Sequence, residues 1–341
     1  MIILLIGVLS ALILLLFACV ITSGNPGAKG GIFTVPWLNP ATSPEPYSVY
    51  LTTEGGILRK IDPQTDRILT NVTLGSGSGA IVANPDDGRL YVCNGNNVTV
   101  IDTADDSIVK NLTFDMGACW AELSPDGSRL FVNYCGHDAP GNVAIVDTTN
   151  YEVIGTVYDV PFSWGMAVSP DGKYLYMSDY WDNRLTVIDT KKASIVKSIS
   201  CGLAGGNAAD VAVSPDGKTV YVSIWSANYL AIINTDTMSR EDTVNMQGRS
   251  SSGVVVSPDG RYVYLSCCDA NSLLIIDADT GRIEDRITVG KCPRHVMLTP
   301  DGRYLYILSE DAPIVKFDTQ SRMIESRMGI RGSNAAFPAG Q

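Results

Sequence analysis

The sequence predicts an all-β fold in which seven four-stranded sheets form a closed ring, preceded by a single long hydrophobic N-terminal α-helix. A unit containing a Ser-Pro-Asp-Gly-like turn recurs seven times, and its turn prolines lie 40 to 45 residues apart. Apolar residues make up 45% of the chain and charged residues only 18%, which favours a packed core over disorder. The first charged side chain is Lys29, so the chain begins with a long apolar stretch.

Each repeat unit reads as four strands, for example 211–213, 219–222, 230–233 and 242–244. In the turn after the first strand, Pro presets φ, Asp bonds back to the backbone and Gly accepts positive φ, so the turn closes a hairpin. A lone four-stranded sheet leaves apolar faces exposed, whereas sheets arranged radially cover one another. The units therefore predict a seven-bladed β-propeller. The turn prolines are Pro44, Pro85, Pro125, Pro170, Pro215, Pro258 and Pro300.

The second strand of the unit carries Tyr91-Val92-Cys93-Asn94 in one copy and Tyr221-Val222-Ser223 in another. With the recurring turn, it resembles the YVTN-type propeller repeats of archaeal surface-layer proteins and related secreted proteins. The resemblance covers residues 44–328 and implies an extracellular, cell-surface location.

Residues 1–24 are uncharged, and a helix of about 22 apolar residues spans about 33 Å, enough to cross a membrane. The segment lacks the basic start of a secretory signal and resembles the mature N-terminus of type IV and archaeal pilins. That resemblance implies a filament core made of packed helices, and a plain membrane anchor is the alternative. Residues 24–27, Gly-Asn-Pro-Gly, end the helix. The expected domains are the helix at 1–24, a linker at 25–42 and the propeller at 43–341.

The first repeat unit departs from the pattern, because 43–46 read Ser-Pro-Glu-Pro and 38–42 do not read as an inner strand. Residues 332–340 resemble an inner strand followed by a turn. We therefore expect the C-terminal segment to close the ring by supplying the inner strand of the first blade, with residues 32–35 as the competing candidate.

Composition also indicates the partners and the compartment. A net charge of −11 leaves no basic stripe for nucleic acid. The eight cysteines form no CxxC pair or zinc pattern, which favours an oxidising compartment. Three acceptor sequons, at Asn71, Asn97 and Asn111, predict glycosylation and favour the extracellular location.

In this topology the start of each inner strand and the end of each second strand lie on one face of the ring. Residues at these positions vary between units, as in binding loops on a rigid scaffold. The tryptophans among them would stack on a glycan or pack against a protein partner, or else fill space between blades. The candidate ligand-binding residues are Trp120, Trp164, Tyr180, Trp181, Asp210, Trp225, His295 and Glu310.

Four cysteines on the same face are disulfide candidates. Cys119 and Cys135 belong to one unit, and Cys268 and Cys292 flank the step between two units. The sequence does not determine the connectivity.

We find no catalytic motif, so we expect no enzyme, no metal and no cofactor. The two histidines, His137 and His295, lie in different units, and an Asp210–His295 dyad is a minor alternative. The leading hypothesis is a structural or adhesive filament subunit that assembles with copies of itself through the N-terminal helix and meets the membrane before assembly. The alternatives are a membrane-anchored module that binds a glycan or protein, and a cofactor-dependent propeller enzyme.

Overall fold

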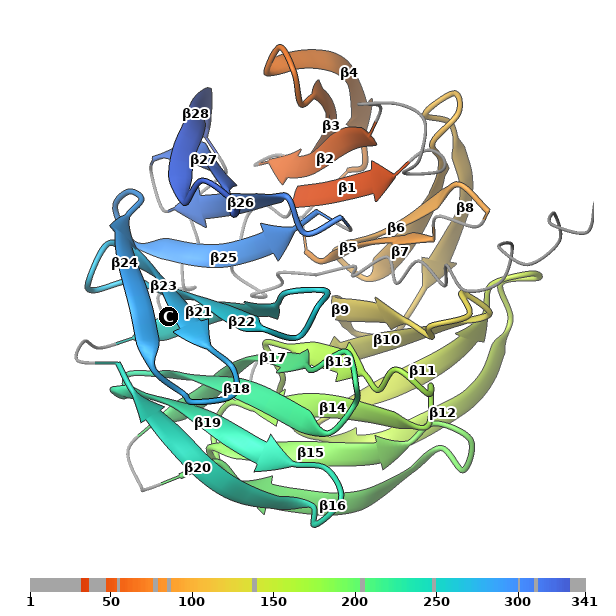
Figure 1. The fold of residues 1–341 in the computed structure, drawn as a ribbon. Coiled ribbons are helices and arrows are strands. Elements are labelled where there is room, and N and C mark those ends of the chain that lie inside the picture. The colour runs from red at the N-terminus through yellow and green to blue at the C-terminus, as the bar shows by residue number, and fades with distance from the viewer. Residues whose placement is uncertain are drawn as a thin grey trace, which may run out of the picture.

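The computed structural model describes residues 32–36, 47–53, 56–75, 79–84, 87–136, 140–202, 206–246, 250–299, 301–309 and 312–331. These residues form seven four-stranded antiparallel sheets arranged as blades around a centre, which makes the fold a seven-bladed β-propeller (Figure 1). The helix expected at 1–24 lies outside the described residues. Within the described ranges, no helix has the length and apolar character needed to span a bilayer.

Each blade consists of four strands that follow one another in the chain, and the first of them lies nearest the centre. Listed from inner to outer strand, the blades are β1 (Ile32–Pro36), β2 (Tyr47–Thr53), β3 (Ile57–Asp62), β4 (Arg67–Thr73); β5 (Ile81–Asn84), β6 (Arg89–Asn94), β7 (Asn97–Asp102), β8 (Ile108–Thr113); β9 (Gly117–Leu123), β10 (Arg129–Cys135), β11 (Gly141–Asp147), β12 (Val153–Val160); β13 (Met166–Val168), β14 (Tyr174–Asp179), β15 (Arg184–Asp189), β16 (Ser194–Ser200); β17 (Asn207–Val213), β18 (Thr219–Trp225), β19 (Tyr229–Asn234), β20 (Ser239–Asn245); β21 (Ser251–Val256), β22 (Tyr262–Cys267), β23 (Ser272–Asp277), β24 (Ile283–Thr288); and β25 (Pro293–Leu298), β26 (Tyr304–Ser309), β27 (Pro313–Asp318), β28 (Met323–Arg331).

The first blade corrects the expected ring closure. Its inner strand is β1, which pairs with β2 from Ile32↔Leu51 to Pro36↔Tyr47, so the competing candidate at residues 32–35 occupies this position. The blade therefore begins inside the segment expected to be a linker. Residues 332–341, expected to supply this strand, lie outside the described residues.

Blade 7 meets blade 1 through side chains. Leu51 and Ile61 of blade 1 share a buried cluster with Tyr306 and Leu308 of blade 7. Across the same boundary, the Lys316 ammonium donates to a backbone carbonyl of blade 1 at 3.2 Å. Apolar packing thus joins the two ends of the described chain.

The recurring turn has the predicted chemistry. In blade 5 the Ser214 hydroxyl donates to Asp216 at 2.6 Å and accepts the amide of Thr219 at 2.9 Å. Gly217 has a φ of 73°, a conformation that glycine adopts without a steric penalty. The same serine–aspartate contact recurs in blades 3, 4 and 6, with threonine replacing serine in blade 7.

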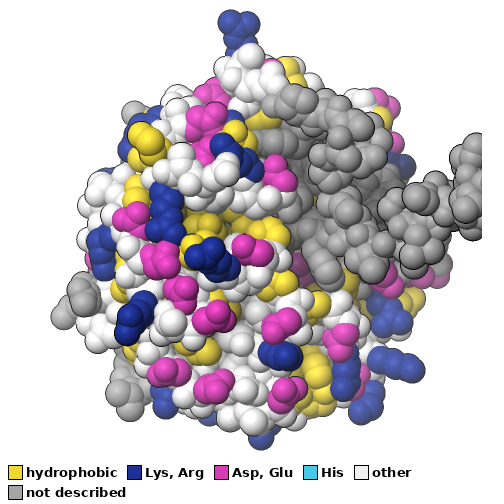
Figure 2. Space-filling model, in the orientation of Figure 1, with side chains coloured by type: hydrophobic (Ala, Val, Ile, Leu, Met, Phe, Trp, Pro, Cys, Tyr) yellow, Lys and Arg dark blue, Asp and Glu magenta, His cyan; other side chains and the backbone are white. Residues whose placement is uncertain are grey.

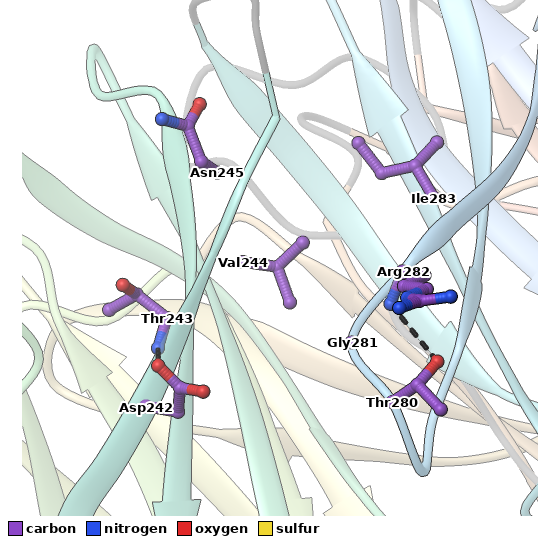
Figure 3. A pocket seen from close by; sticks show the side chains of 8 residues that line it. All are labelled: Asp242, Thr243, Val244, Asn245, Thr280, Gly281, Arg282 and Ile283. Carbon is purple, nitrogen blue, oxygen red and sulfur yellow. Dashed lines mark hydrogen bonds between the residues drawn. The ribbon is translucent and has the colours of Figure 1, made fainter.

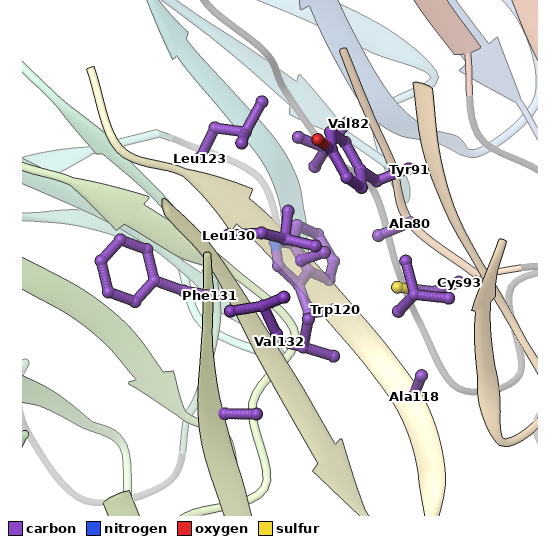
Figure 4. Packing of buried hydrophobic residues seen from close by; sticks show 14 of the residues in the cluster. Ala80, Val82, Tyr91, Cys93, Ala118, Trp120, Leu123, Leu130, Phe131 and Val132 are labelled. Atoms are coloured by element: carbon purple, nitrogen blue, oxygen red, sulfur yellow. The ribbon is translucent and has the colours of Figure 1, made fainter. Parts of the chain in front are cut away.

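The core lies between neighbouring blades, where apolar faces cover one another. Figure 4 shows Trp120 of blade 3 packed among Ala80 and Tyr91 of blade 2 and Leu130 of its own blade. Second and third strands are largely buried, whereas outer strands such as β20 are mostly exposed. Variable residues can therefore reach solvent at the ends of the strands and at the rim.

Candidate functional site

Five aromatic side chains gather on one face of blades 4 and 5, and we call them the aromatic face. They come from the segment before β13 and from the end of β14 and β18, because antiparallel pairing brings inner-strand starts beside second-strand ends. The Trp164 and Tyr180 rings stack with centroids 4.1 Å apart, and Trp225 meets Trp164 edge-on at 6.3 Å. The members of the aromatic face are Phe162, Trp164, Tyr180, Trp181 and Trp225.

Exposure differs within the aromatic face. Phe162, Trp164 and Tyr180 are buried, whereas Trp181 is 58% exposed and contacts both Phe162 and Tyr180. An exposed indole fixed against buried rings offers a rigid flat surface to a ligand.

Arg294 of blade 7 adds positive charge beside this face. Its guanidinium carbon lies 5.0 Å from the centroid of the Trp225 ring, within range of a cation–π interaction. Arg294 did not emerge from the sequence as a candidate.

A β-bulge explains why Arg294 was missed. The inner strands β9, β17, β21 and β25 each shift register against their second strand near the same position. The extra residue changes which side chain reaches the face. Cys119, Trp164 and Arg294 lie six residues before a turn proline, whereas the sequence candidates Trp120 and His295 lie five residues before one.

The remaining sequence candidates lie elsewhere. Trp120 is 1% exposed and belongs to the core between blades 2 and 3, so the space-filling alternative holds for this residue. His295 is partly accessible on β25, and enclosure by the protein, followed by the charge of Arg294, lowers its pKa to about 3. Glu310 lies outside the described residues.

The Asp210 carboxylate forms hydrogen bonds within blade 5 and to blade 6. One carboxylate oxygen accepts the amide of Val211 at 2.9 Å, and the other accepts that of Val254 in blade 6 at 3.0 Å. Burial raises its pKa from 3.8 to about 7. Since both oxygens serve backbone amides, the Asp210–His295 dyad does not form.

Glu122 is a second acidic group near the centre that the sequence did not single out. Burial, followed by the negative charge of Asp210, raises its pKa well above the usual value. Two carboxyl groups thus share an environment in which ionisation of one disfavours ionisation of the other.

The two cysteine pairs differ. Cys268 and Cys292, one of the two candidate pairs, form a disulfide that joins the loop after β22 to the segment before β25. Cys119 and Cys135 are unbonded thiols whose sulfurs lie 2.7 Å apart. No group of three or more His, Cys, Asp or Glu side chains suited to a metal ion occurs among the described residues.

The three sequons differ in their surroundings. Asn71 is exposed on β4, whereas the side-chain oxygen of Asn97 accepts from Thr113 at 2.7 Å. The side-chain oxygen of Asn111 accepts from Thr99 at 2.8 Å. Glycosylation stays a prediction at all three sites, and Asn71 and Asn111 are the two whose side chains are exposed.

A groove of about 400 Å³ opens at the rim between blades 5 and 6 (Figure 3). It is lined by residues 242–245 of β20 and 280–283 before and within β24. Its polar side chains bond mainly to their own neighbours, as Asp242 does with the amide of Thr243. The surface in the view of Figure 2 likewise mixes acidic and basic groups. The aromatic face is therefore the better candidate site.

Two family models match parts of the chain. The Cytochrome D1 heme domain model matches residues 130–251, which contain all of the aromatic face, and the model "Lactonase, 7-bladed beta-propeller" matches residues 234–326, which contain Arg294. Each covers less than half of the chain. The comparison with curated proteins finds no match.

Solved structures of low sequence identity share the fold. Kuenenia stuttgartiensis hydrazine synthase matches with a TM-score of 0.67 and 21% identity, covering 83% of this chain and 93% of that one. A functionally unknown protein from Desulfotomaculum acetoxidans matches with a TM-score of 0.72 and 17% identity over 82% and 94%. The Cps50 (Swd1) propeller domain of Myceliophteria thermophila matches at 0.64 and 16% over 77% and 89%.

These matches correct one expectation. The absence of a catalytic motif predicted that the chain is not an enzyme, but one matching family model is named for a lactonase propeller and the other for a cytochrome haem domain. Short sequence patterns do not reveal a site that a propeller would assemble from several blades. The chain is a seven-bladed β-propeller with distant, enzyme-related likenesses.

Proposed function

We propose that this chain is an enzyme-related propeller that binds a planar ligand on the aromatic face. The observation that carries this proposal is Trp181, which is 58% exposed yet held against Phe162 and Tyr180. A flat ring, aromatic or sugar, would stack there without reorganising the protein. Arg294 beside Trp225 favours a ligand that also carries a negative group.

Haem, which the first family model names, has both features, a flat ring and carboxylates. The aromatic face would hold the ring, and the positive charge of the buried Arg294 would attract its carboxylates. Haem supplies electron transfer when bound.

Titration of the purified chain with haem, and separately with a neutral oligosaccharide, tests the proposal through tryptophan fluorescence. We expect saturable binding of at least one probe and at least tenfold weaker binding by Trp181→Ala. The matched control is Tyr158→Ala, which removes an aromatic side chain that is 68% exposed on the outer strand β12. The proposal fails if neither probe binds, or if both variants bind as the wild type does.

The filament role is a separate proposal about how the propeller is displayed. It is supported by the uncharged segment 1–24 and includes self-association through that segment, with a membrane anchor as the alternative. The disulfide Cys268–Cys292 agrees with the proposed extracellular location. Electron microscopy of the full chain and of a chain lacking residues 1–24 tests it, because only the full chain should form fibres.

A further inference from the structure

Cys119 and Cys135 form a close thiol pair in blade 3. Their sulfurs are 2.7 Å apart, and the side chains are only 6% and 4% exposed. The pairing of β9 with β10 explains this approach. Asn133 pairs with Trp120 and Tyr134 with Ala118, so Cys119 is the extra residue of the bulge, and its thiol lies beside that of Cys135 at the end of β10.

The two thiols have different chemistry. A hydrogen bond from the Cys135 thiol stabilises the Cys119 thiolate, so the pKa of Cys119 is lowered and that of Cys135 is raised. The thiolate is the reactive form of cysteine, and Cys119, which lies at the bulge, is the thiol that we assign to the first attack, with Cys135 as the resolving group.

The thiol pair also belongs to the floor of the aromatic face. Cys119 and Cys135 share one buried cluster with Phe162, Trp164 and Tyr180. Closing a covalent bond between the sulfurs would shift atoms packed against those rings, since a close-packed interior transmits small displacements.

We propose that Cys119 and Cys135 are a peroxide-reactive dithiol whose oxidation to a disulfide alters the packing of the aromatic face. The Cys119 thiolate attacks one oxygen of hydrogen peroxide, the O–O bond breaks, and the hydroxide that leaves takes up a proton to become water. The resulting sulfenic acid is attacked by the Cys135 sulfur, the S–S bond forms, and the sulfenic oxygen leaves with the thiol proton as a second water. Two thiols are oxidised and one peroxide is reduced.

Other buried cysteines act as internal controls. Burial raises the pKa of Cys201 to about 12 and that of Cys267 to about 11. Neither has a partner thiol like that of Cys119, so both are expected to stay reduced under the same treatment.

The test treats the full chain with hydrogen peroxide and maps its peptides by mass spectrometry. We expect a linked Cys119–Cys135 peptide lighter by two hydrogen atoms than the reduced pair, and a change in tryptophan fluorescence that a thiol reductant reverses. Cys119→Ser and Cys135→Ser should lose both signals, whereas Cys201→Ser should keep both. This readout needs no ligand, so it is independent of the proposed function.

Three results would overturn the proposal. The first is a wild-type chain in which no linked peptide forms. The second is Cys201 or Cys267 reacting faster than Cys119. The third is a linked peptide that leaves the fluorescence unchanged, because the thiols would then not be coupled to the aromatic face. Thermal unfolding of each Ser variant, compared with the wild type, shows whether a lost signal reflects lost folding.

Discussion

Asp210→Asn should change how the stability of the propeller depends on pH. Asp210 is 7% exposed, and its pKa is raised from 3.8 to about 7. A pKa difference of this size corresponds to about 4 kcal/mol. The ionised carboxylate is therefore the less stable form in the folded state. Asn is uncharged at every pH, but its NH2 group cannot accept the amide that one of the Asp210 oxygens accepts.

The sign follows from proton binding. Between pH 3.8 and about 7, the folded chain holds a proton on Asp210 that the unfolded chain has released, so stability falls as pH rises. Glu122, whose pKa is also raised, acts in the same direction. His295 acts oppositely between about 3 and 6.5, because its lowered pKa makes the unfolded chain the better proton acceptor. The wild-type curve alone therefore cannot isolate Asp210.

Urea unfolding of wild type and Asp210→Asn from pH 4 to pH 8 isolates the contribution. We expect the variant to be less stable than the wild type by about 1–3 kcal/mol at pH 4, because one buried backbone amide loses its acceptor, and the difference to shift in favour of the variant by up to about 4 kcal/mol by pH 8. Asp242→Asn removes an exposed carboxylate from the outer strand of the same blade and controls for net charge. A difference between wild type and Asp210→Asn that stays constant with pH would refute the reasoning.

Three further changes should alter the free energy of unfolding measured in urea. Gly253→Ala should cost about 1–3 kcal/mol, because a Cβ there would lie 2.8 Å from a backbone nitrogen of β25, whereas Gly329→Ala, with nothing within 4 Å, should cost little. Lys60→Met should cost about 1–3 kcal/mol, because it removes the ammonium 3.1 Å from the partly buried Asp106 carboxylate in the next blade, and the exposed Lys192→Met should cost far less. Reducing the disulfide between blades 6 and 7, which closes a loop of 24 residues, should cost about 3 kcal/mol.

The fold could be predicted from the sequence because the same four-strand unit recurs along the chain. Each Ser-Pro-Asp-Gly turn is weak evidence alone, but seven repeat units at nearly constant spacing, most of them with this turn or a close variant, leave few arrangements that bury every sheet. The first blade was harder to read because it lacks that turn. Its inner strand, Ile32–Pro36, is short, and residues 37–46 separate it from β2 in the chain. The sequence therefore did not show clearly that these two segments pair.

The site was only partly readable because side-chain direction depends on register. Trp164, Tyr180, Trp181 and Trp225 were predicted to share a face, and the structure brings these four together. Arg294 was missed, because one bulge residue reverses which neighbouring side chain points to the face. The composition and the periodicity of the sequence do not predict a bulge of this kind.

Near the bulges, some side chains hold neighbouring blades together, whereas others face solvent. The amide of Asp210 donates to Ser223, whose hydroxyl donates to the carbonyl of Ser252 in the next blade at 2.5 Å, and the Asp210 carboxylate accepts the amide of Val254. Asp210 is thereby committed to holding inner strands together. A side chain that serves backbone amides on two blades is not available to a ligand without loosening the ring.

Trp181, by contrast, is held by ring contacts on one side and leaves its other surface to solvent. We therefore expect substitutions at Asp210 to change stability and its pH dependence first, and substitutions at Trp181 to change binding while leaving stability nearly untouched.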